Sequence, residues 1–434
     1  SFVKDKLGCR SKFIKKGVYL KIMSNTLFVG IDISSQTIAV YFMDQTGKGP
    51  KSSIELNNDL MDATLLVEHI LTYADTIKAD SVKIGMESTS DYALHLHHFL
   101  ASVPDLEPLS PQIYVLNPAI VNGFKKTLTF RQKTDDLDAK LIADCVRFGR
   151  VEPTKIPDPR YPALQRLTRY RFQLVQSLTN EKNRALHLVY LKFSSYRSDK
   201  LFSDTFGKAS ASILESFSVE EISAMPMEDL VKFICENGNN RLKDPEAIAS
   251  KLQVLARRAY RLNPDISDSI ELTLSMSLEN IRFMESQVTR IDREIARQLR
   301  AFRQTLDTIP GIGPTLSACI VSEIGDISRF HNDAALAKFA GLVWTRYQSG
   351  SFDAQNTSLA KCGNAYLRYY LVEAANSLRV HNEEFKAFYQ KKYNEVTKHQ
   401  HKRALVLTAR KFVRLVYAML SKGQIYNGGG AGLK

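Results

Sequence analysis

From residue 26 to residue 150, short apolar runs alternate with amphipathic ones. The runs Thr26–Asp32 and Thr37–Met43, separated by a polar turn, predict the two strands of a hairpin. Further strands are predicted at Ser52–Leu56, Ser81–Glu87 and Gln112–Leu116, and helices at Asp59–Ile77, at Tyr92–Leu100 and after Pro118. A three-strand meander followed by alternating helices and strands resembles the order of an RNase H-like sheet. We therefore expect an α/β domain of this class over residues 25–152, not a doubly wound dinucleotide-binding fold.

Two long charged segments, Pro159–Phe193 and Asp265–Phe302, predict long helices. In the second, apolar residues recur at the 4-3 spacing of a coiled coil over roughly four heptads. The predicted seam comprises Ile270, Leu274, Ser277, Ile281, Met284, Val288, Ile291, Ile295, Gln298 and Phe302. Its partner could be the helix Leu164–Leu191 of the same chain, a second protomer, or both. A glutamate-rich segment between the helices, about 197–264, predicts an inserted helical lobe within a coiled-coil region of residues 153–305.

The last region, residues 306–426, is expected to be mostly α-helical. Ile309-Pro-Gly-Ile-Gly313 is a helix-hairpin-helix signature, in which Gly311 and Gly313 form a tight turn whose backbone amides can hold a phosphate. An irregular polar loop is expected at Trp344–Cys362, and residues 427–434 are expected to be a disordered, glycine-rich tail. Helices are predicted at Ala334–Ala340, Ala365–Asn376 and Arg403–Leu420.

Composition adds a charge argument. The 434 residues carry 59 Lys and Arg against 46 Asp and Glu, a formal net charge of +13, which favours nucleic acid as a partner over an anionic membrane surface. No apolar stretch approaches the ~18 residues of a membrane helix. The five cysteines include no C-x-x-C pair, which fits reduced thiols in a cytosol and offers no zinc site. Residues 1–24 form a predicted basic extension: an upstream appendage, a nucleic-acid-binding arm or a cloning artefact.

Four acidic residues of the first domain suit a divalent metal. Asp32 and Glu87 each end a predicted apolar strand, and Asp135 and Asp138 share one face of the predicted helix Thr134–Phe148 because they are three residues apart. Carboxylate oxygens are ligands that Mg²⁺ and Mn²⁺ prefer. Each acid alone could be a solvated charge or a helix N-cap, but an unpaired charge inside an apolar run is costly. The sequence therefore predicts an Mg²⁺ (or Mn²⁺) site.

Basic residues surround this predicted site and form either a phosphate track or a solvated helix face. They are Lys125, Lys126, Arg131, Lys133, Lys140, Arg147 and Arg150. The loop Trp344–Phe352 adds a hydroxyl, a glycine and a basic residue. Serine is a weak nucleophile unless a base or a metal activates it, and the residues alone do not rank Ser349 above Ser351 or Ser358.

Eight motifs follow one another along the chain: Phe28-Val-Gly-Ile-Asp32, Met86-Glu87-Ser-Thr, Asn117-Pro-Ala119, Lys133-Thr-Asp-Asp-Leu-Asp-Ala139, Ile309-Pro-Gly-Ile-Gly313, Phe339-Ala-Gly-Leu342, Arg346-Tyr-Gln-Ser-Gly350 and Lys361-Cys-Gly-Asn-Ala-Tyr-Leu-Arg368. With them, the chain from Thr26 to about Gly423 resembles the transposases of the insertion sequence 110 family. These proteins join an N-terminal RuvC-like DEDD domain to a C-terminal transposase domain, and Piv-type DNA invertases are similar to them.

The resemblance implies roles for particular residues. It makes Ser349 the recombinase nucleophile, which forms a covalent phosphoserine. The implied metal-binding tetrad is Asp32, Glu87, Asp135 and Asp138. Nucleic-acid contacts are expected at Lys133, Gly311, Gly313, Arg346 and Arg368. Members of the family are guided by a structured bridge RNA whose loops pair with target and donor DNA.

The expected protein is therefore an RNA-guided, Mg²⁺-dependent DNA recombinase of an insertion sequence. We expect a homo-oligomer, a dimer or a dimer of dimers with a composite site, in a prokaryotic cytoplasm close to the nucleoid. The basic extension and the long segment between the two helices depart from the family pattern. The alternatives are a guide-free site-specific DNA invertase, a RuvC-like Holliday-junction nuclease that uses the same tetrad, and a non-catalytic nucleic-acid-binding scaffold.

Overall fold

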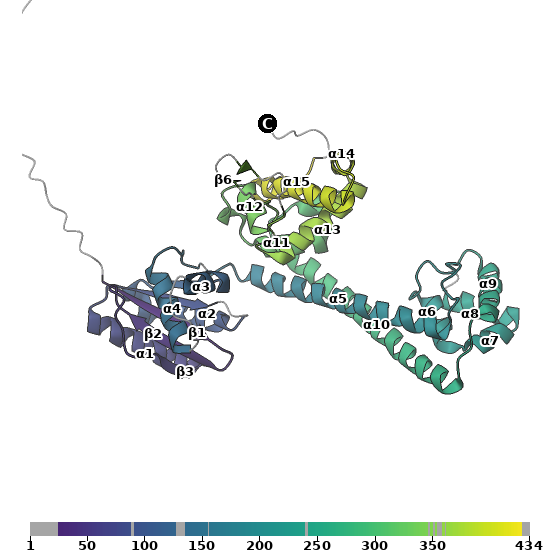
Figure 1. The fold of residues 1–434 in the computed structure, drawn as a ribbon, viewed down its shortest axis with the longest axis horizontal. Helices are drawn as coiled ribbons and strands as arrows, with labels where there is room; N and C mark the ends of the chain where they lie inside the picture. Colours follow the sequence, from purple (N-terminus) through teal and green to yellow (C-terminus); the bar gives the residue numbers. More distant parts are fainter. Residues whose placement is uncertain are drawn as a thin grey trace, which may run out of the picture. The chain divides into compact units, whose positions relative to one another are not determined.

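A computed structural model of the chain describes residues 25–87, 91–126, 135–154, 156–238, 242–345, 348–349, 352–353, 358–360 and 362–427. The predicted basic extension, residues 1–24, lies outside these ranges, as does the predicted tail beyond residue 427. The chain divides into two compact units, one through Ile156 and one from Pro157 onward, and Figure 1 shows the elements of each. None of the described helices is both long enough and apolar enough to span a membrane.

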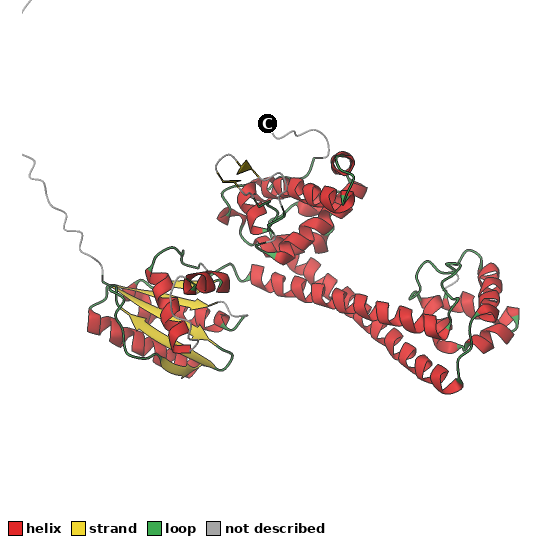
Figure 2. Ribbon diagram, viewed as in Figure 1, coloured by secondary structure: helices red, strands yellow, loops and turns green. Residues whose placement is uncertain are grey.

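The first unit is built on a five-stranded sheet in the order β3-β2-β1-β4-β5. Figure 2 shows the strands of this sheet in yellow, with helices packed around them. Its strands are β1 (Thr26–Ile33), β2 (Thr37–Met43), β3 (Ile54–Asn57), β4 (Ser81–Glu87) and β5 (Gln112–Leu116). β1, β2 and β3 are antiparallel neighbours, whereas β4 is parallel to β1 and β5 is parallel to β4. The five predicted strands are confirmed, because continuous apolar runs bounded by polar turns identify them.

Both faces of this sheet are covered by helices. The helical elements are α1 (Leu60–Ile77), α2 (Ala93–Ser102), the 3-10 helix η1 (Pro104–Leu109), α3 (Pro118–Lys125) and α4 (Asp135–Arg147). On one face, Val29 and Ile31 pack with residues of α1 and α2. On the other, Phe28 packs with α4 and with Val121 of α3. The near-continuous burial of β1 follows, since a central strand covered on both faces needs apolar side chains on both.

The second unit is organised by two long helices, α5 (Arg160–Lys192) and α10 (Pro264–Leu299). They are antiparallel, because ion pairs join Arg171 to Asp292 at 2.5 Å near one end and Lys192 to Glu271 at 3.2 Å near the other. Of the predicted seam, Met284 and Val288 are half-buried, and the fully buried members are Ile270, Leu274, Ser277, Ile281, Ile291 and Ile295. The sequence left three partners open for this seam, and the structure packs it against α5 of the same chain.

The end of the predicted seam needs correction. α10 ends at Leu299, which is buried, whereas the predicted Gln298 is half-buried. A helix turns 3.6 residues per turn, so a strict seven-residue repeat drifts off the buried face by this point. Phe302 lies beyond the helix, where its ring packs against that of Tyr161 at 4.9 Å between centroids.

Four short helices fill the segment between α5 and α10. They are α6 (Lys208–Ser216), α7 (Val219–Ala224), α8 (Met227–Asn237) and α9 (Pro245–Arg258). Their apolar residues form one core with Val189 and Phe193 of α5 and with Leu274 and Ile281 of α10. This lobe therefore closes over one end of the long helix pair.

The rest of the second unit is mostly helical. Its elements are the 3-10 turns η2 (Leu306–Thr308) and η3 (Ile327–Arg329), helices α11 (Pro314–Ile324), α12 (Asp333–Phe339), α13 (Ala365–His381), α14 (Glu383–Asn394) and α15 (Gln400–Lys422), and strands β6 (Gln348–Ser349) and β7 (Phe352–Asp353). α14 was not predicted from the sequence, because Phe385 is the one fully buried residue among its described side chains. Asn382 is its N-cap, and the Asn382 side chain accepts hydrogen bonds from the amides of Glu384 and Phe385.

Candidate functional site

The two central parallel strands end at one edge of the sheet, and each carries an acid there. Ile31 of β1 is opposite Met86 of β4, so Asp32 and Glu87 occupy neighbouring positions. Glu87 ends β4 as predicted, but β1 continues through Ile33, one residue beyond Asp32. In open α/β sheets, ligands bind outside the carboxyl ends of the strands. The structure therefore brings two predicted site residues to an edge suited to a ligand.

Two glycines let α4 lie directly against these strands. A Cβ atom on Gly30 would be 2.0 Å from the carbonyl oxygen of Ala139, and one on Gly85 would also overlap atoms of α4. Such an approach is possible only where no Cβ is present. Because Asp138 precedes Ala139 in the chain, this contact brings its carboxylate toward the edge that bears the other two acids. The glycines of β1 and β4 therefore have a role in the site that no sequence motif revealed.

The electrostatics of Glu87 report this convergence. Partial burial is the largest cause that raises the pKa of Glu87, and the carboxylates of Asp32 and Asp138 raise it further, while Lys125 opposes them. Lys125 Nζ lies 2.5 Å from Asp138 Oδ1. Among the side chains that the structure describes, Glu87 is therefore exposed to two like charges, a repulsion that a bound cation would relieve.

The donor chemistry of this edge fits Mg²⁺ or Mn²⁺, since carboxylate oxygens are hard ligands and Glu87 is held among like charges. Asp135 begins α4, three residues before Asp138, and its side chain is outside the described side chains. Among the side chains that the structure describes, no three His, Cys, Asp or Glu residues are close enough to hold one ion. The four-residue metal site thus remains a prediction that the convergence of three acids supports.

Several members of the predicted basic track have partners inside the first unit. Arg147 NH2 lies 2.6 Å from Asp144 Oδ1, and Lys140 stands over the ring of Tyr41 at 5.5 Å. Arg150 stacks over the neighbouring Phe148. Lys133 and Arg131 lie outside the described residues. A phosphate track would therefore need these cations to exchange partners.

The segment that carries Ser349 contains two short strands, where the sequence predicted an irregular loop. Ser349 pairs with Phe352 in the short β6–β7 hairpin. The base of the segment is closed by a bridge between Trp344 and Leu359, and the amide of Thr345 donates to the Ser358 carbonyl at 2.9 Å. The Ser349 side chain, Arg346 and Ser351 lie outside what the structure describes. The described backbone within residues 344–359 therefore pairs at two places, at Ser349 with Phe352 and at the base of the segment.

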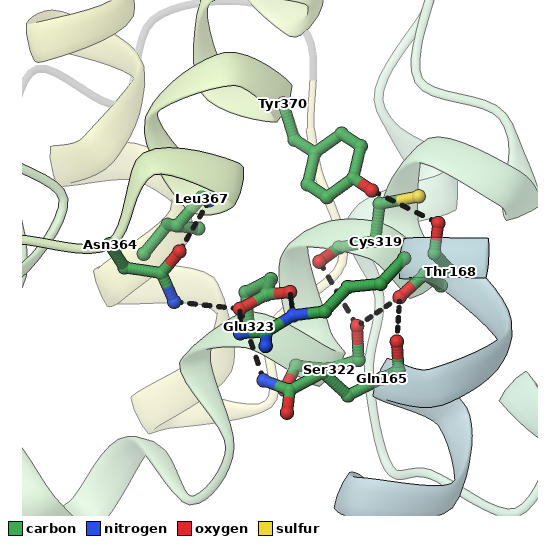
Figure 3. A network of polar contacts seen from close by, with 9 residues as sticks. Gln165, Thr168, Cys319, Ser322, Glu323, Asn364, Leu367 and Tyr370 are labelled. Carbon is green, nitrogen blue, oxygen red and sulfur yellow. Dashed lines mark hydrogen bonds and ion pairs between the residues drawn. The ribbon is translucent and has the colours of Figure 1, made fainter. Parts of the chain in front are cut away.

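A buried polar network anchors the end of this segment (Figure 3). Glu323 of α11 is fully buried, and its carboxylate accepts two hydrogen bonds from Arg169 of α5, at 2.7 and 2.9 Å. The same carboxylate accepts from Gln165 at 3.0 Å and from Asn364 Nδ2 at 2.7 Å. Asn364 Oδ1 in turn accepts from the amide of Leu367 and caps α13. The residue at which the serine segment joins α13 is thus held by three helices.

The predicted nucleic-acid contact Arg368 has a partner within its own unit. Arg368 NH1 donates to the carbonyl of Ala340 at 3.2 Å, and a Cβ atom on Gly341 would come within 2.4 Å of the same nitrogen. Gly341 has φ of +69°, a conformation that favours glycine. Arg368 therefore stabilises the turn at residues 340–341, before the segment that carries Ser349. Its contact with nucleic acid stays a prediction.

The predicted helix-hairpin-helix differs from expectation in its first half. A single 3-10 turn, η2, precedes the Ile309–Gly313 turn, and α11 follows it. Gly311 has φ of +93°, and the amide of Ile312 donates to the Ile309 carbonyl at 2.9 Å, as in a Pro-Gly type II turn. Gly311 O also accepts from Ser377 of α13 at 2.6 Å. Gly313, at the N-terminus of α11, is exposed, and a Cβ atom there would meet nothing within 4 Å.

Sequence reasoning missed the Arg169–Glu323–Asn364 network. Glu323 lies in an apolar stretch of α11, and a charge in such a stretch requires partners, which was the available signal. The partners could not be named, since Arg169 is 154 positions away in the chain.

Comparisons with known proteins give the chain relatives. Residues 29–193 match a DEDD family described as "Transposase", and residues 303–390 match the "Transposase IS116/IS110/IS902 family". The first match spans the four predicted carboxylates and the second spans Ser349.

Three curated relatives illustrate the similarity. The "Insertion element IS116 uncharacterized 44.8 kDa protein" of Streptomyces clavuligerus is 25% identical over 68% of this chain and 72% of its own length. The "Pilin gene-inverting protein" of Moraxella lacunata is 27% identical over 80% of both chains. The "Transposase for insertion sequence element IS1111A" of Coxiella burnetii is 30% identical, but over 29% of this chain and 35% of its own. With both family domains in this order, the chain belongs to the IS110 family of transposases.

Proposed function

We propose that the protein is an RNA-guided recombinase that moves an insertion sequence by cutting and joining donor and target DNA through a phosphoserine on Ser349. The observation that carries the proposal is the convergence of Asp32, Glu87 and Asp138 from three elements. Partial burial and, after it, the two neighbouring carboxylates raise the pKa of Glu87. Carboxylates that lie close together repel one another and destabilise the fold, and a bound cation offsets this repulsion.

The architecture of the first unit supports an RNase H-like assignment. Three antiparallel strands are followed by two strands parallel to β1, in the order β3-β2-β1-β4-β5. The acids lie on the central pair, β1 and β4, and on α4, which packs across it. By this assignment, the unit is the RuvC-like domain, and the long helix pair with its lobe is the coiled-coil region.

Asp32, Glu87, Asp135 and Asp138 are the proposed ligands. A bound Mg²⁺ or Mn²⁺ would neutralise these carboxylates and polarise a scissile phosphate. Lys125 pairs with Asp138 at this edge. Its ammonium would add a positive charge to that of the metal ion when a phosphate binds. The formal charge of +13 adds attraction for the DNA and RNA backbones, so binding should weaken steeply with salt.

Ser349 supplies the step that distinguishes exchange from hydrolysis. Its Oγ forms a bond to phosphorus, the bond from phosphorus to the departing DNA oxygen breaks, and that oxygen takes up a proton. A hydroxyl of the incoming strand then attacks the phosphoserine, and Oγ regains its proton. The ester bond is conserved throughout, whereas water as nucleophile would lose it. The pairing of Ser349 with Phe352 and the bridge between Trp344 and Leu359 support this assignment.

The proposal extends to partners and place. Donor DNA, target DNA and a structured bridge RNA are the substrates and guide, with Lys133, Gly313 and Arg346 as candidate contacts. Two protomers would share each composite site, within a dimer or a dimer of dimers. The protein would act in a prokaryotic cytoplasm, at the nucleoid.

The test is a strand-exchange assay with Glu87→Gln and Asp138→Asn, using protein purified with its bound RNA. Joined product should require Mg²⁺ and fall at least ~100-fold in both variants, because each removes a proposed ligand charge. Asp144→Asn is the matched control: it lies on α4 as well, but it pairs with Arg147 instead of joining the acidic edge. Full activity of the two site variants would refute the metal site.

A guide-free DNA invertase is the second candidate, favoured by the similarity to the "Pilin gene-inverting protein" over 80% of both chains. Ribonuclease treatment separates the two. Loss of joining after removal of RNA supports the guided recombinase, and retained joining supports the invertase. Cut but unjoined, hydrolysed ends would instead indicate a nuclease, and metal-independent binding with no cleavage would indicate a scaffold.

A further inference from the structure

The serine segment, which carries Ser349 between α12 and α13, has its two ends hydrogen-bonded to each other. The amide of Ala360 donates to the carbonyl of Val343 at 2.8 Å. The amide of Asn364 donates to the carbonyl of Phe339, the last residue of α12, at 2.7 Å. Asn364 is also the N-cap of α13. The position of this one residue therefore sets both where the segment ends and where the next helix begins.

The side-chain amide of Asn364 has one favourable orientation (Figure 3). Its Oδ1 accepts a hydrogen bond from the amide of Leu367 at 3.0 Å, and its Nδ2 donates to Oε2 of Glu323 at 2.7 Å. Turning the amide over would place its NH2 group against the Leu367 amide and its oxygen against a carboxylate. Asn364 is therefore held on two sides, by its own helix and by α11.

Glu323 holds that amide in place because its own acceptor positions are used. A carboxylate offers about four lone-pair positions. This one accepts from Arg169 through both oxygens, and from Gln165 and Asn364 through Oε2. A substrate does not reach a side chain that is fully buried. Any effect of Glu323 on chemistry must therefore pass through Asn364.

Helix capping alone does not account for this arrangement. Serine, threonine, aspartate and asparagine all cap helices by accepting the same hydrogen bond, so the cap of α13 needs no second partner. Asn332, the N-cap of α12, accepts from the amide of Ala335 at 2.8 Å and is exposed. Burying a carboxylate is costly even when it is paired. The bond from Asn364 to Glu323 therefore adds a constraint on position that the helix itself does not require.

We propose that Asn364 is a positioning residue for the reaction at Ser349, and that Glu323 acts through it. The bond to Glu323 holds the junction between the serine segment and α13 in one place, so that Oγ of Ser349 stays aligned with the scissile phosphate. A displacement of about 1 Å at a nucleophile can cost roughly 100-fold in rate. The inference rests on the proposed role of Ser349 and adds two residues that act without contacting the reacting atoms.

The test uses variants that keep the cap of α13 and break only the bond to Glu323. Asn364→Ser retains a hydroxyl that can accept from Leu367 but is too short to reach the carboxylate, and Asn364→Asp places a second carboxylate beside Glu323. The full chain, purified with its bound RNA, is given a nicked DNA that traps the adduct. Both variants should form the Ser349 adduct at least ~30-fold more slowly at saturating DNA, with an unchanged dissociation constant for DNA.

Two controls separate position from stability. Asn332→Ser and Asn332→Asp make the same changes at the exposed N-cap of α12 and should leave the rate unchanged. Leu378→Ala removes a buried side chain later in α13, so it destabilises the helix while leaving the cap intact. It should lower the unfolding temperature more than Asn364→Ser does and slow adduct formation less.

A second readout needs no chemistry. The amides of Thr345 and Ala360 donate to the opposite end of the serine segment, so their hydrogen exchange reports how firmly its two ends are held together. Exchange at both should quicken by about tenfold in Asn364→Ser and stay unchanged in Asn332→Ser.

The two readouts distinguish the inference from the proposed function. If wild type forms no adduct on Ser349, the proposed function is wrong, and the exchange rates still decide whether Asn364 positions the segment. Three results would each overturn the inference: unchanged exchange in Asn364→Ser, adduct formation by that variant at the wild-type rate, or equal slowing in Leu378→Ala.

Discussion

Glu87 and Glu323 are two carboxylates in apolar surroundings with opposite environments. Glu87, in the first unit, is partly buried beside the carboxylates of Asp32 and Asp138, and its burial and these charges raise its pKa. Glu323, in the second, accepts hydrogen bonds from Arg169, Gln165 and Asn364 and is fully buried. Among the described side chains, Glu87 faces two like charges, whereas Glu323 faces hydrogen-bond donors. The contrast distinguishes a carboxylate that is suited to bind a cation from one that links helices through hydrogen bonds.

The hydrogen-bonded carboxylate of Glu323 should contribute more to the free energy of unfolding than Glu87 does. Glu323→Ala leaves the guanidinium of Arg169 and the amide of Asn364 without their acceptor, and we expect a loss of about 3–5 kcal/mol in the free energy of unfolding. Glu323→Gln keeps the shape and one acceptor oxygen and should lose less. Urea unfolding measures both. Glu294→Ala removes a partly exposed acid paired with Arg297 and should change stability little. Equal losses for Glu294→Ala and Glu323→Ala would contradict the comparison.

The two glycines of the Ile309–Gly313 turn repeat the contrast on a smaller scale. Gly311→Ala forces a left-handed conformation and brings its Cβ to 3.0 Å from Ser377 Oγ and His381 Cβ, so we expect a loss of about 1–2 kcal/mol. Gly313→Ala meets nothing and should leave stability unchanged while weakening nucleic-acid binding at the N-terminus of α11. Thermal unfolding and filter binding test both, and equal destabilisation would remove the distinction.

At the acidic edge around Glu87, pH and metal should change the free energy of unfolding by the smallest amounts. The raised pKa of Glu87 means that the fold favours its protonated form, so its stabilising contribution is present below the ordinary value of 4.5 and is lost as pH rises through the raised pKa. Without metal, Glu87→Gln should gain a fraction of a kcal/mol over wild type near pH 7, since partial exposure screens the repulsion.

Mg²⁺ should reverse that order by stabilising wild type and not Glu87→Gln, and less strongly at low pH, where the carboxylates hold protons. Differential scanning fluorimetry with and without Mg²⁺ is the measurement. If the two proteins respond equally to Mg²⁺ at every pH, the acidic edge is not a metal site.

Local sequence patterns predicted much of the fold and part of the candidate site. The five strands follow from continuous apolar runs, and Asp32 and Glu87 stand out because they interrupt two of them. The reason that Asp138 joins them is tertiary: Gly30 and Gly85 admit α4 to the sheet. No spacing in the sequence encodes that contact.

Other features depended on contacts between distant residues. A 4-3 pattern shows that α10 has an apolar seam but not what covers it. Packing and ion pairs identify α5 of the same chain as one partner. The same pattern does not show that Leu272, Met276 and Phe283 of this helix are exposed. The β6–β7 hairpin escaped prediction since its strands are two residues long.

The central claim is a covalent bond between DNA and Ser349. The most direct measurement is to run the reaction on a suicide DNA substrate, nicked so that one fragment leaves, then denature and map the protein–DNA adduct by peptide mass. The account predicts one adduct on Ser349, kept by Ser351→Ala and absent from Ser349→Ala. An adduct on Ser351, or hydrolysed ends produced efficiently by Ser349→Ala, would contradict it.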